Sequence, residues 1–193
     1  MRPVLAAAFA LLALLPAACN KKSADTKAPA QTEAAKTAAA QPVSGPGVPG
    51  PGYNPTSEES TAKFLADYAA LPGVTKTADG LLYRVIKAGN GKSPLKTDDQ
   101  VTVLYKGQLI DGAVFDQTKP QNPADPDSGP RTFPAGMLIP GWVEALSKMK
   151  EGDQWEIVTP YQIAYGEEGH PPAIPAKAAL VFQMSLLKVD LTP

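Results

Sequence analysis

The stretch Leu138-Ile139-Pro140-Gly141-Trp142 decides the fold, because it opens a helix in a region that otherwise alternates like strands. Apolar residues from Trp142 onward recur at helical spacing, which predicts one buried face. They are Trp142, Ala145, Leu146 and Met149. Lys148 and Gly152 mark the expected C-terminal end of this helix.

Four segments around this helix have the pattern of strands. They are residues 81–88, 100–110, 153–159 and 179–189, which are rich in β-branched and aromatic residues. Turn residues such as Gly89-Asn90-Gly91 and Asp111-Gly112 follow two of them. Runs of strands with a single short helix predict an α+β domain, in which an antiparallel sheet wraps around that helix.

A second, short helix is expected ahead of the strands. Ser57 is a favourable N-cap residue, and Glu58 and Glu59 suit the first turn because the helix dipole favours acids there. Four apolar residues then follow at helical spacing: Phe64, Leu65, Tyr68 and Leu71. We therefore expect ordered structure to begin near Ser57, with residues 57–79 forming a packing helix and a lead-in.

The first 18 residues have the pattern of a secretory signal peptide. Arg2 precedes an apolar run that is too short to span a bilayer, and Ala17-Ala18 supply the small residues of a cleavage site. Cys19, the only cysteine, follows directly. This arrangement resembles a bacterial lipoprotein signal, which implies lipidation at Cys19 and, with Asn20 next, the outer membrane. Ordinary cleavage beside an accidental cysteine is the alternative.

Residues 19–56 are expected to form a disordered tether. They are rich in alanine, lysine, threonine, proline and glycine, and large apolar side chains are nearly absent. No core can then offset the entropy of ordering the chain. Together with the lipid, the tether predicts a protein anchored in the bacterial cell envelope, facing the periplasm or the surface.

The composition excludes several kinds of chemistry. His170 is the only histidine, so neither a metal cluster nor a histidine pair is expected. No phosphate loop or dinucleotide fingerprint follows a strand, and we expect no cofactor. The net charge of -1 lacks the basic footprint of a nucleic-acid-binding protein.

Six aromatic residues are spaced too widely to belong to one element. They are Tyr105, Phe115, Phe133, Trp142, Tyr165 and Phe182. They form either part of an ordinary core or the walls of an apolar pocket. A pocket without a nucleophile or a base suits rotation about a bond better than cleavage of one.

The chain from about residue 80 to 188 resembles the FKBP-type peptidyl-prolyl cis-trans isomerases. The motifs that carry the resemblance are Val103-Leu104-Tyr105-Lys106-Gly107, Asp111-Gly112, Val114-Phe115-Asp116, Leu138-Ile139-Pro140-Gly141-Trp142, Ala164-Tyr165-Gly166, His170-Pro171, Ile174-Pro175 and Leu180-Val181-Phe182. The lead-in, with Thr77-Ala78-Asp79-Gly80, resembles the Mip-like bacterial branch. The resemblance implies an isomerase domain over residues 80–193.

The resemblance also implies the site residues. Those that act on the rotating bond are Tyr105, Phe115, Asp116, Tyr165 and Phe182. Those that bind the substrate are Phe133, Leu138, Ile139, Trp142, His170 and Ile174, the last two at the rim. In this scheme the Ile139 N–H receives a substrate carbonyl, Asp116 presents an acceptor beside the amide, and Tyr165 donates its hydroxyl.

The physical chemistry of the amide agrees with such a pocket. Amide resonance sets a barrier of about 18–20 kcal/mol to rotation about the X-Pro bond. The twisted transition state has lost that resonance and is less polar than the planar amide. A dry aromatic pocket therefore favours the twisted form, and no covalent step is needed.

The expected partners follow from this function. They are proline-containing peptides and unfolded envelope proteins, with macrolide inhibitors as further candidate ligands. A monomer is expected, because a tether stands where Mip-like relatives have a helical dimerisation domain. Two alternatives stay open: a non-catalytic peptide-binding chaperone, and a surface lipoprotein that binds a partner through the long loop 117–131. Arg131 and Ala173 depart from the family at the rim of the pocket.

Overall fold

The computed structural model describes residues 47–94, 96–122, 124–125 and 128–193, which all belong to one compact unit. Its elements in chain order are α1 (Glu58–Ala69), β1 (Val74–Lys76), β2 (Leu82–Lys87), β3 (Gln100–Leu109), β4 (Val114–Gln117), β5 (Arg131–Pro134), α2 (Pro140–Lys148), β6 (Gln154–Thr159), the 3-10 turn η1 (Tyr161–Ile163) and β7 (Leu180–Asp190). The expected signal peptide, Cys19 and most of the expected tether lie outside the described residues. Within them, no helix is both long and apolar enough to cross a membrane.

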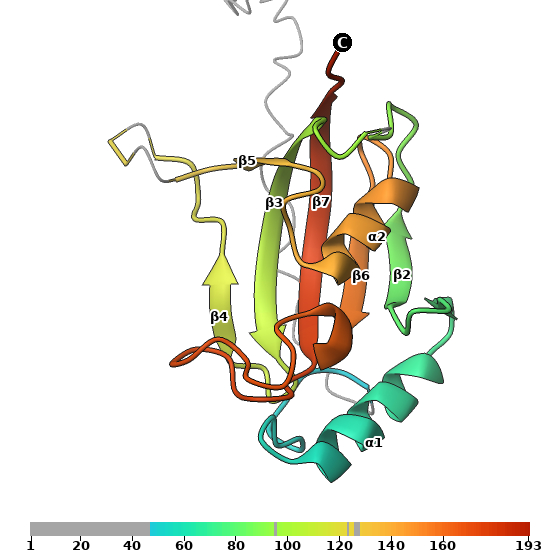
Figure 1. The fold of residues 1–193 in the computed structure, drawn as a ribbon, viewed down its shortest axis with the longest axis vertical. Helices are drawn as coiled ribbons and strands as arrows, with labels where there is room; N and C mark the ends of the chain where they lie inside the picture. The colour runs from blue at the N-terminus through green and yellow to red at the C-terminus, as the bar shows by residue number, and fades with distance from the viewer. Residues whose placement is uncertain (1–46, 95, 123, 126–127) are drawn as a thin grey trace, which may run out of the picture. The chain divides into compact units, whose positions relative to one another are not determined.

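The strands form one seven-stranded antiparallel sheet. Its order is β1-β2-β6-β7-β3-β4, and β5 pairs with β3 beside β4. The long strands β3 and β7 pair along their whole length at the centre. The helix α2 lies against one face of this sheet (Figure 1), where Ala145, Leu146 and Met149 are fully buried among strand residues. The prediction of an antiparallel sheet wrapped around one short helix is confirmed.

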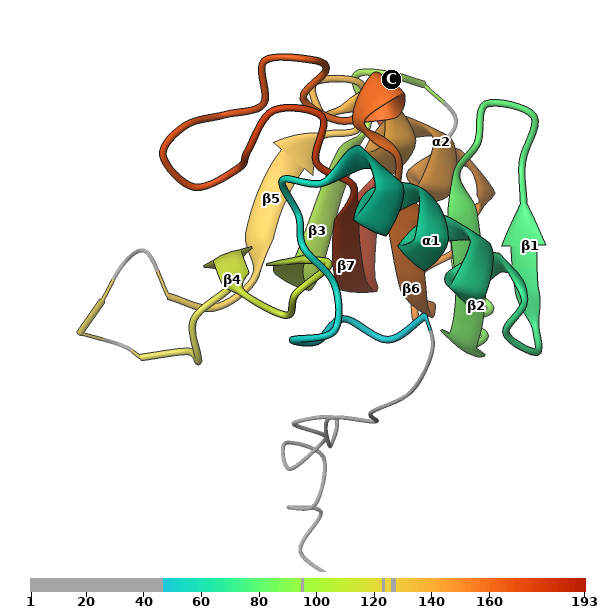
Figure 2. The same ribbon diagram turned by 90° about the horizontal axis from the view of Figure 1, so that it is seen from below.

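The helix α1 packs against the end of the sheet where β2 begins and β6 ends, as the view from below shows (Figure 2). Its N-cap is Ser57, whose side chain accepts a hydrogen bond from the Ser60 N–H, as the sequence predicted. Phe64 and Tyr68 are fully buried in a second, smaller apolar cluster, which also contains Leu82, Ile110, Val158, Ala179 and Val181. Both faces of the sheet are therefore covered at this end.

A polar contact holds α1 to the sheet as well. The Tyr68 hydroxyl donates to Glu156 Oε1 at 3.1 Å, and the Arg84 guanidinium binds the same oxygen at 2.8 Å. Burial, and then the nearby Glu156 carboxylate, raise the pKa of Tyr68 far above its usual range. The phenol therefore stays protonated and remains a hydrogen-bond donor at neutral pH.

Three short strands escaped the sequence analysis. β1, β4 and β5 contain only three or four residues each. Such a segment is too short to show an alternating pattern, so tertiary pairing rather than local sequence defines it. Two of them matter for the site, because β4 carries Phe115 and Asp116 and β5 carries Phe133.

Residues 47–56 differ from the expectation that order begins near Ser57. The Tyr53 ring packs edge-on against Phe64, with centroids 4.9 Å apart. Its hydroxyl donates to Asp67 at 2.7 Å and accepts from the Gly47 N–H at 2.9 Å. The Gly50 N–H also donates to the Ile110 carbonyl at 2.9 Å. The Tyr53 side chain and the Gly50 backbone thus hold a proline- and glycine-rich segment to the folded unit.

This contact yields a stability prediction. Replacing Tyr53 with alanine removes the ring contact and both hydrogen bonds, so the free energy of unfolding should fall by about 2 kcal/mol. Urea denaturation of the full chain measures the change. Pro51→Ala is the matched control, because Pro51 is an exposed residue of the same segment. If the two variants unfold at the same urea concentration, Tyr53 does not anchor the segment.

Candidate active site

A cavity of about 180 Å³ opens between the start of α2, the strands β3, β4, β5 and β7, and the loop after η1. Nine side chains line it: Tyr105, Phe115, Asp116, Phe133, Leu138, Ile139, Trp142, Tyr165 and Phe182. All nine were predicted from the sequence as site residues. The fold therefore brings together residues that lie up to 77 positions apart in the chain, between Tyr105 and Phe182.

Edge-to-face contacts fix the aromatic walls of the cavity. The Trp142 ring meets Tyr105 at a centroid distance of 5.2 Å and 84°, and it meets Phe182 at 5.2 Å and 87°. Phe115 in turn stands edge-on to Phe182 at 5.7 Å. Such T-shaped pairs are the favoured arrangement of aromatic rings. The cavity is therefore shaped by rings that hold one another in place before any ligand arrives.

The backbone at the start of α2 positions Trp142 at the cavity and leaves the Ile139 N–H available to a ligand. Ile139 is the N-cap, with a non-helical ψ of 146°, and Pro140 fills the first helical position, where a missing N–H costs nothing. The Ile139 carbonyl accepts from the Trp142 N–H at 2.9 Å. Among the described residues, the Ile139 N–H itself donates to no acceptor. It can therefore receive an acceptor from a ligand.

Two glycines allow the close approaches that the site requires. A Cβ on Gly107 would lie 2.7 Å from Phe115 Cζ and 3.0 Å from Phe182 Cε1. A Cβ on Gly141 would collide with Thr159 Cγ2, so a side chain there would push α2 away from β6. In the sequence both glycines stand out only as members of the motifs. Their role in these close approaches follows from the positions of the strands and the helix.

The polar side of the cavity consists of two phenols and a carboxylate. The Tyr105 hydroxyl donates to Asp116 Oδ2 at 2.6 Å, which fixes the direction of the carboxylate. Burial, followed by this hydrogen bond, raises the pKa of Tyr105 well above its usual range. Burial, and then the Asp116 charge, also raise the pKa of Tyr165. Both phenols therefore remain neutral donors at physiological pH.

Two predicted rim residues do not line the cavity. Ile174 is only 3 % exposed and belongs to the main apolar core, so its expected place at the rim is corrected. His170 is exposed and stacks on Tyr165, with centroids 5.5 Å apart. His170 and Ile174 exchange backbone hydrogen bonds: the His170 N–H donates to the Ile174 carbonyl at 2.9 Å, and the Ile174 N–H donates to the His170 carbonyl at 3.0 Å. They therefore brace the loop that carries Tyr165.

The two residues that were expected to alter the rim of the pocket also lie outside the cavity. Arg131 and Ala173 are exposed and are not among the lining residues. Across the part of the chain that the structure describes, no three histidine, cysteine, aspartate or glutamate residues gather as a metal site would require. The cavity thus offers apolar shape, two phenolic donors, one backbone N–H and one carboxylate.

The sequence of this chain matches a known protein family. Residues 91–187, half of the chain, match the model of the FKBP-type peptidyl-prolyl cis-trans isomerase family. The chain belongs to this family, and the family resemblance predicted from the motifs is confirmed.

Individual relatives agree with this assignment. The chain is 44% identical over 131 residues to the peptidyl-prolyl cis-trans isomerase Mip of Coxiella burnetii, covering 68% of this chain and 54% of that protein. It is 39% identical over 140 residues to the outer membrane protein MIP of Legionella longbeachae, covering 71% and 57%. The matched region thus spans little more than half the length of these curated relatives.

A solved structure supports the same fold. The crystal structure of a peptidyl-prolyl cis-trans isomerase from Pseudomonas syringae pv. tomato has a TM-score of 0.61 to this chain at 35% sequence identity. The similarity covers 68% of this chain and 92% of that chain.

The close approach at Gly107 gives a prediction about the cavity. Gly107→Ala should displace the Phe115 and Phe182 rings and cost about 2 kcal/mol of stability, because overpacking forces neighbouring side chains apart. Urea denaturation measures the stability, and NMR shifts of the Phe182 and Trp142 ring protons report the displacement. Gly52→Ala is the control, since a Cβ there meets nothing within 4 Å. Unchanged ring shifts in the Gly107 variant would contradict the packing described here.

Proposed function

We propose that this protein is a peptidyl-prolyl cis-trans isomerase that acts on unfolded proteins of the bacterial envelope, with the aromatic cavity as its active site. The cavity itself is the observation that carries the proposal. Its aromatic walls suit a proline ring, and its donors and acceptor surround the place where the preceding amide would lie. The names of the relatives in Coxiella burnetii and Pseudomonas syringae support the same activity.

Catalysis in this proposal comes from stabilising the twisted amide rather than from a covalent step. The proline ring packs between Trp142, Phe182 and Tyr105, which excludes water from the bond that rotates. A less polar environment favours the twisted amide, because that form has lost its resonance dipole. Lowering the barrier by about 8 kcal/mol would accelerate the rotation about a millionfold.

The polar groups hold the peptide in place while the bond turns. The Ile139 N–H receives a carbonyl of the substrate, and the Tyr165 hydroxyl donates to a second one. The Asp116 carboxylate, oriented by Tyr105, lies beside the amide whose carbonyl carbon becomes more electrophilic as resonance is lost. Phe115, Phe133 and Leu138 complete the apolar walls.

An isomerase assay with a proline tetrapeptide tests the activity. The folded full chain should accelerate cis-trans exchange, and Asp116→Asn should lower kcat/KM about tenfold because a charged acceptor is lost from the site. Asp98→Asn is the matched control, since Asp98 is an exposed carboxylate outside the cavity. A folded chain that leaves the exchange at its uncatalysed rate contradicts the proposal and favours the non-catalytic chaperone.

We also propose that Cys19 carries a lipid that anchors a monomer in the outer membrane. The signal pattern before Cys19 supports the lipid, and the name of the Legionella relative supports the location. The family resemblance adds macrolide inhibitors as candidate ligands of the aromatic cavity. The length of loop 117–131 motivates the alternative function, a surface lipoprotein that binds a partner through this loop.

The anchor gives a prediction for cells. Cys19→Ser should release the protein from the membrane fraction. The mass of the processed wild-type protein should exceed the mass of its polypeptide by the mass of the lipid.

The released variant also tests the oligomeric state. Light scattering on it should give the mass of one chain. An unmodified mass for wild-type Cys19 would exclude lipidation, and a mass of two chains would exclude the monomer.

A further inference from the structure

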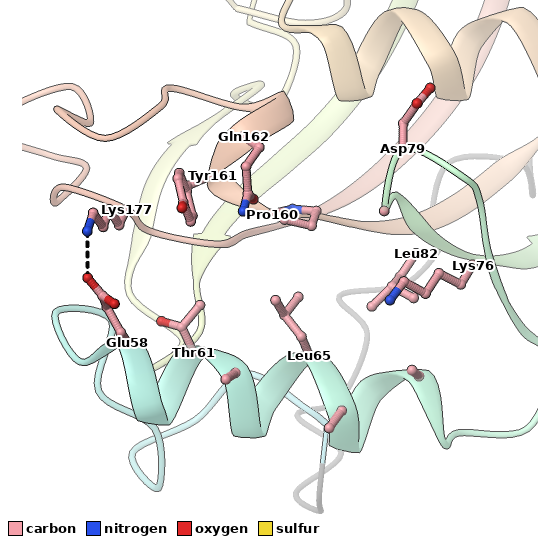
Figure 3. A pocket seen from close by; sticks show the side chains of 14 residues that line it. Glu58, Thr61, Leu65, Lys76, Asp79, Leu82, Pro160, Tyr161, Gln162 and Lys177 are labelled. Atoms are coloured by element: carbon pink, nitrogen blue, oxygen red, sulfur yellow. Dashed lines mark hydrogen bonds and ion pairs between the residues drawn. The ribbon is translucent and has the colours of Figure 1, made fainter.

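A second and larger hollow lies between α1 and the sheet, with a volume of about 690 Å³ (Figure 3). We call it the α1 groove. Fourteen residues line it: Glu58, Thr61, Ala62, Leu65, Ala66, Ala69, Lys76, Asp79, Gly80, Leu82, Pro160, Tyr161, Gln162 and Lys177. None of them lines the aromatic cavity, so the two hollows are separate. A volume of this size falls in the range of ligand-binding clefts.

The floor of the groove is apolar. Leu65 points from α1 into the hollow, with Pro160 and Leu82 on the opposite side (Figure 3). Ala62, Ala66 and Ala69 lie along the same side of α1 and are exposed. Their short side chains leave room where longer ones would close the gap. The groove therefore offers unfilled apolar surface beside a helix that otherwise buries its large residues in the sheet.

The rim of the groove is polar but balanced in charge. Lys177 Nζ pairs with Glu58 Oε1 at 2.7 Å at one end. Lys76 and Asp79, on the opposite side, form no ion pair within the described residues. Two cations and two anions leave no net charge, which suits a neutral polypeptide better than a nucleic acid or an anionic lipid surface.

One buried polar atom in the groove lacks a partner. Thr61 is 7 % exposed, and within the described residues its hydroxyl makes no hydrogen bond. A buried hydroxyl without a partner costs free energy, and a rotation of the Thr61 side chain toward the backbone of a bound peptide would recover it. Tyr161 and Gln162 add polar side chains to the same hollow. The groove thus combines an apolar floor with groups that can bind a peptide backbone.

One short loop contributes a residue to each of the two hollows. Tyr161 lines the groove, and its carbonyl accepts hydrogen bonds from the Ala164 N–H at 3.1 Å and the Gly166 N–H at 2.8 Å. Tyr165, between these two donors, lines the cavity. Only four residues of chain lead from Tyr161 to Tyr165, so these two lining residues are at most about 14 Å apart along the backbone. A few extended residues of a bound peptide, at about 3.3 Å each, span such a distance.

We propose that the α1 groove binds an extended apolar segment of the same unfolded polypeptide whose proline occupies the aromatic cavity. The inference rests on the proposed isomerase function and adds a second contact for long substrates. Two linked contacts on one chain raise affinity, because the second binding event becomes intramolecular. A tetrapeptide fills the cavity alone and gains nothing from the groove.

Filling the groove tests the inference. Ala66→Phe places a large ring in the hollow, and Ala70→Phe is the matched control at an exposed position of the helix end that does not line it. The probe is fluorescein-labelled, reduced and carboxymethylated α-lactalbumin, whose binding to the full chain is followed by anisotropy. Tetrapeptide isomerisation is measured on the same preparations. Ala69→Phe, about one turn further along α1, is a second variant in case Ala66→Phe does not fold.

The expected result separates the two substrates. Ala66→Phe should weaken binding of the unfolded protein about tenfold, while tetrapeptide kcat/KM stays within about twofold of wild type. Ala70→Phe should change neither quantity. Equal binding of the unfolded protein by folded groove variants and wild type overturns the inference. It is also overturned if a groove variant alters the oligomeric mass of the protein and leaves its binding of the unfolded protein unchanged. Absence of tetrapeptide turnover in the wild type contradicts the isomerase function itself, whatever the binding data give.

Discussion

The seating of the Trp142 indole is the constraint on which the rest of this structure depends. The ring stands edge-on to Tyr105 from β3 and to Phe182 from β7, so two central strands and one helix meet at a single side chain. The register of β3 and β7 sets Gly107 opposite Phe182, and the missing side chain at Gly107 lets Phe115 reach the same cluster. The same ring contacts therefore constrain the register of the sheet, the position of the helix and the shape of the cavity.

The sequence predicted the long elements and the cavity, because those depend on strong local patterns and on a connected set of motifs. The segment 100–110 alternates clearly, and β3 was found there as Gln100–Leu109. The short strand β5 was missed, since four residues acquire their conformation from pairing with β3. Residues 47–56 were assigned to the tether because their composition is proline- and glycine-rich, whereas the deciding contact is made by Tyr53 with the distant Phe64.

Ile174 illustrates a different limit. Its place in a Pro-rich loop motif suggested the rim, yet the His170–Ile174 hydrogen bonds turn the loop back and direct the Ile174 side chain into the core. The α1 groove was equally hidden from the sequence, because its walls come from a helix, a β-hairpin and a loop that only the tertiary fold brings together. Remote segments build both hollows, but a connected set of motifs pointed to the residues of the cavity, whereas no motif marks those of the groove.

The central claim is that the cavity over Trp142 receives a proline and that the Ile139 N–H receives a carbonyl of the same peptide. Titration of the ¹⁵N-labelled full chain with a proline tetrapeptide tests it most directly by NMR. The account predicts that the Ile139 amide and the Trp142 indole resonances shift together and saturate at one peptide concentration. Shifts confined to residues outside the cavity, with Ile139 and Trp142 unmoved, would contradict it.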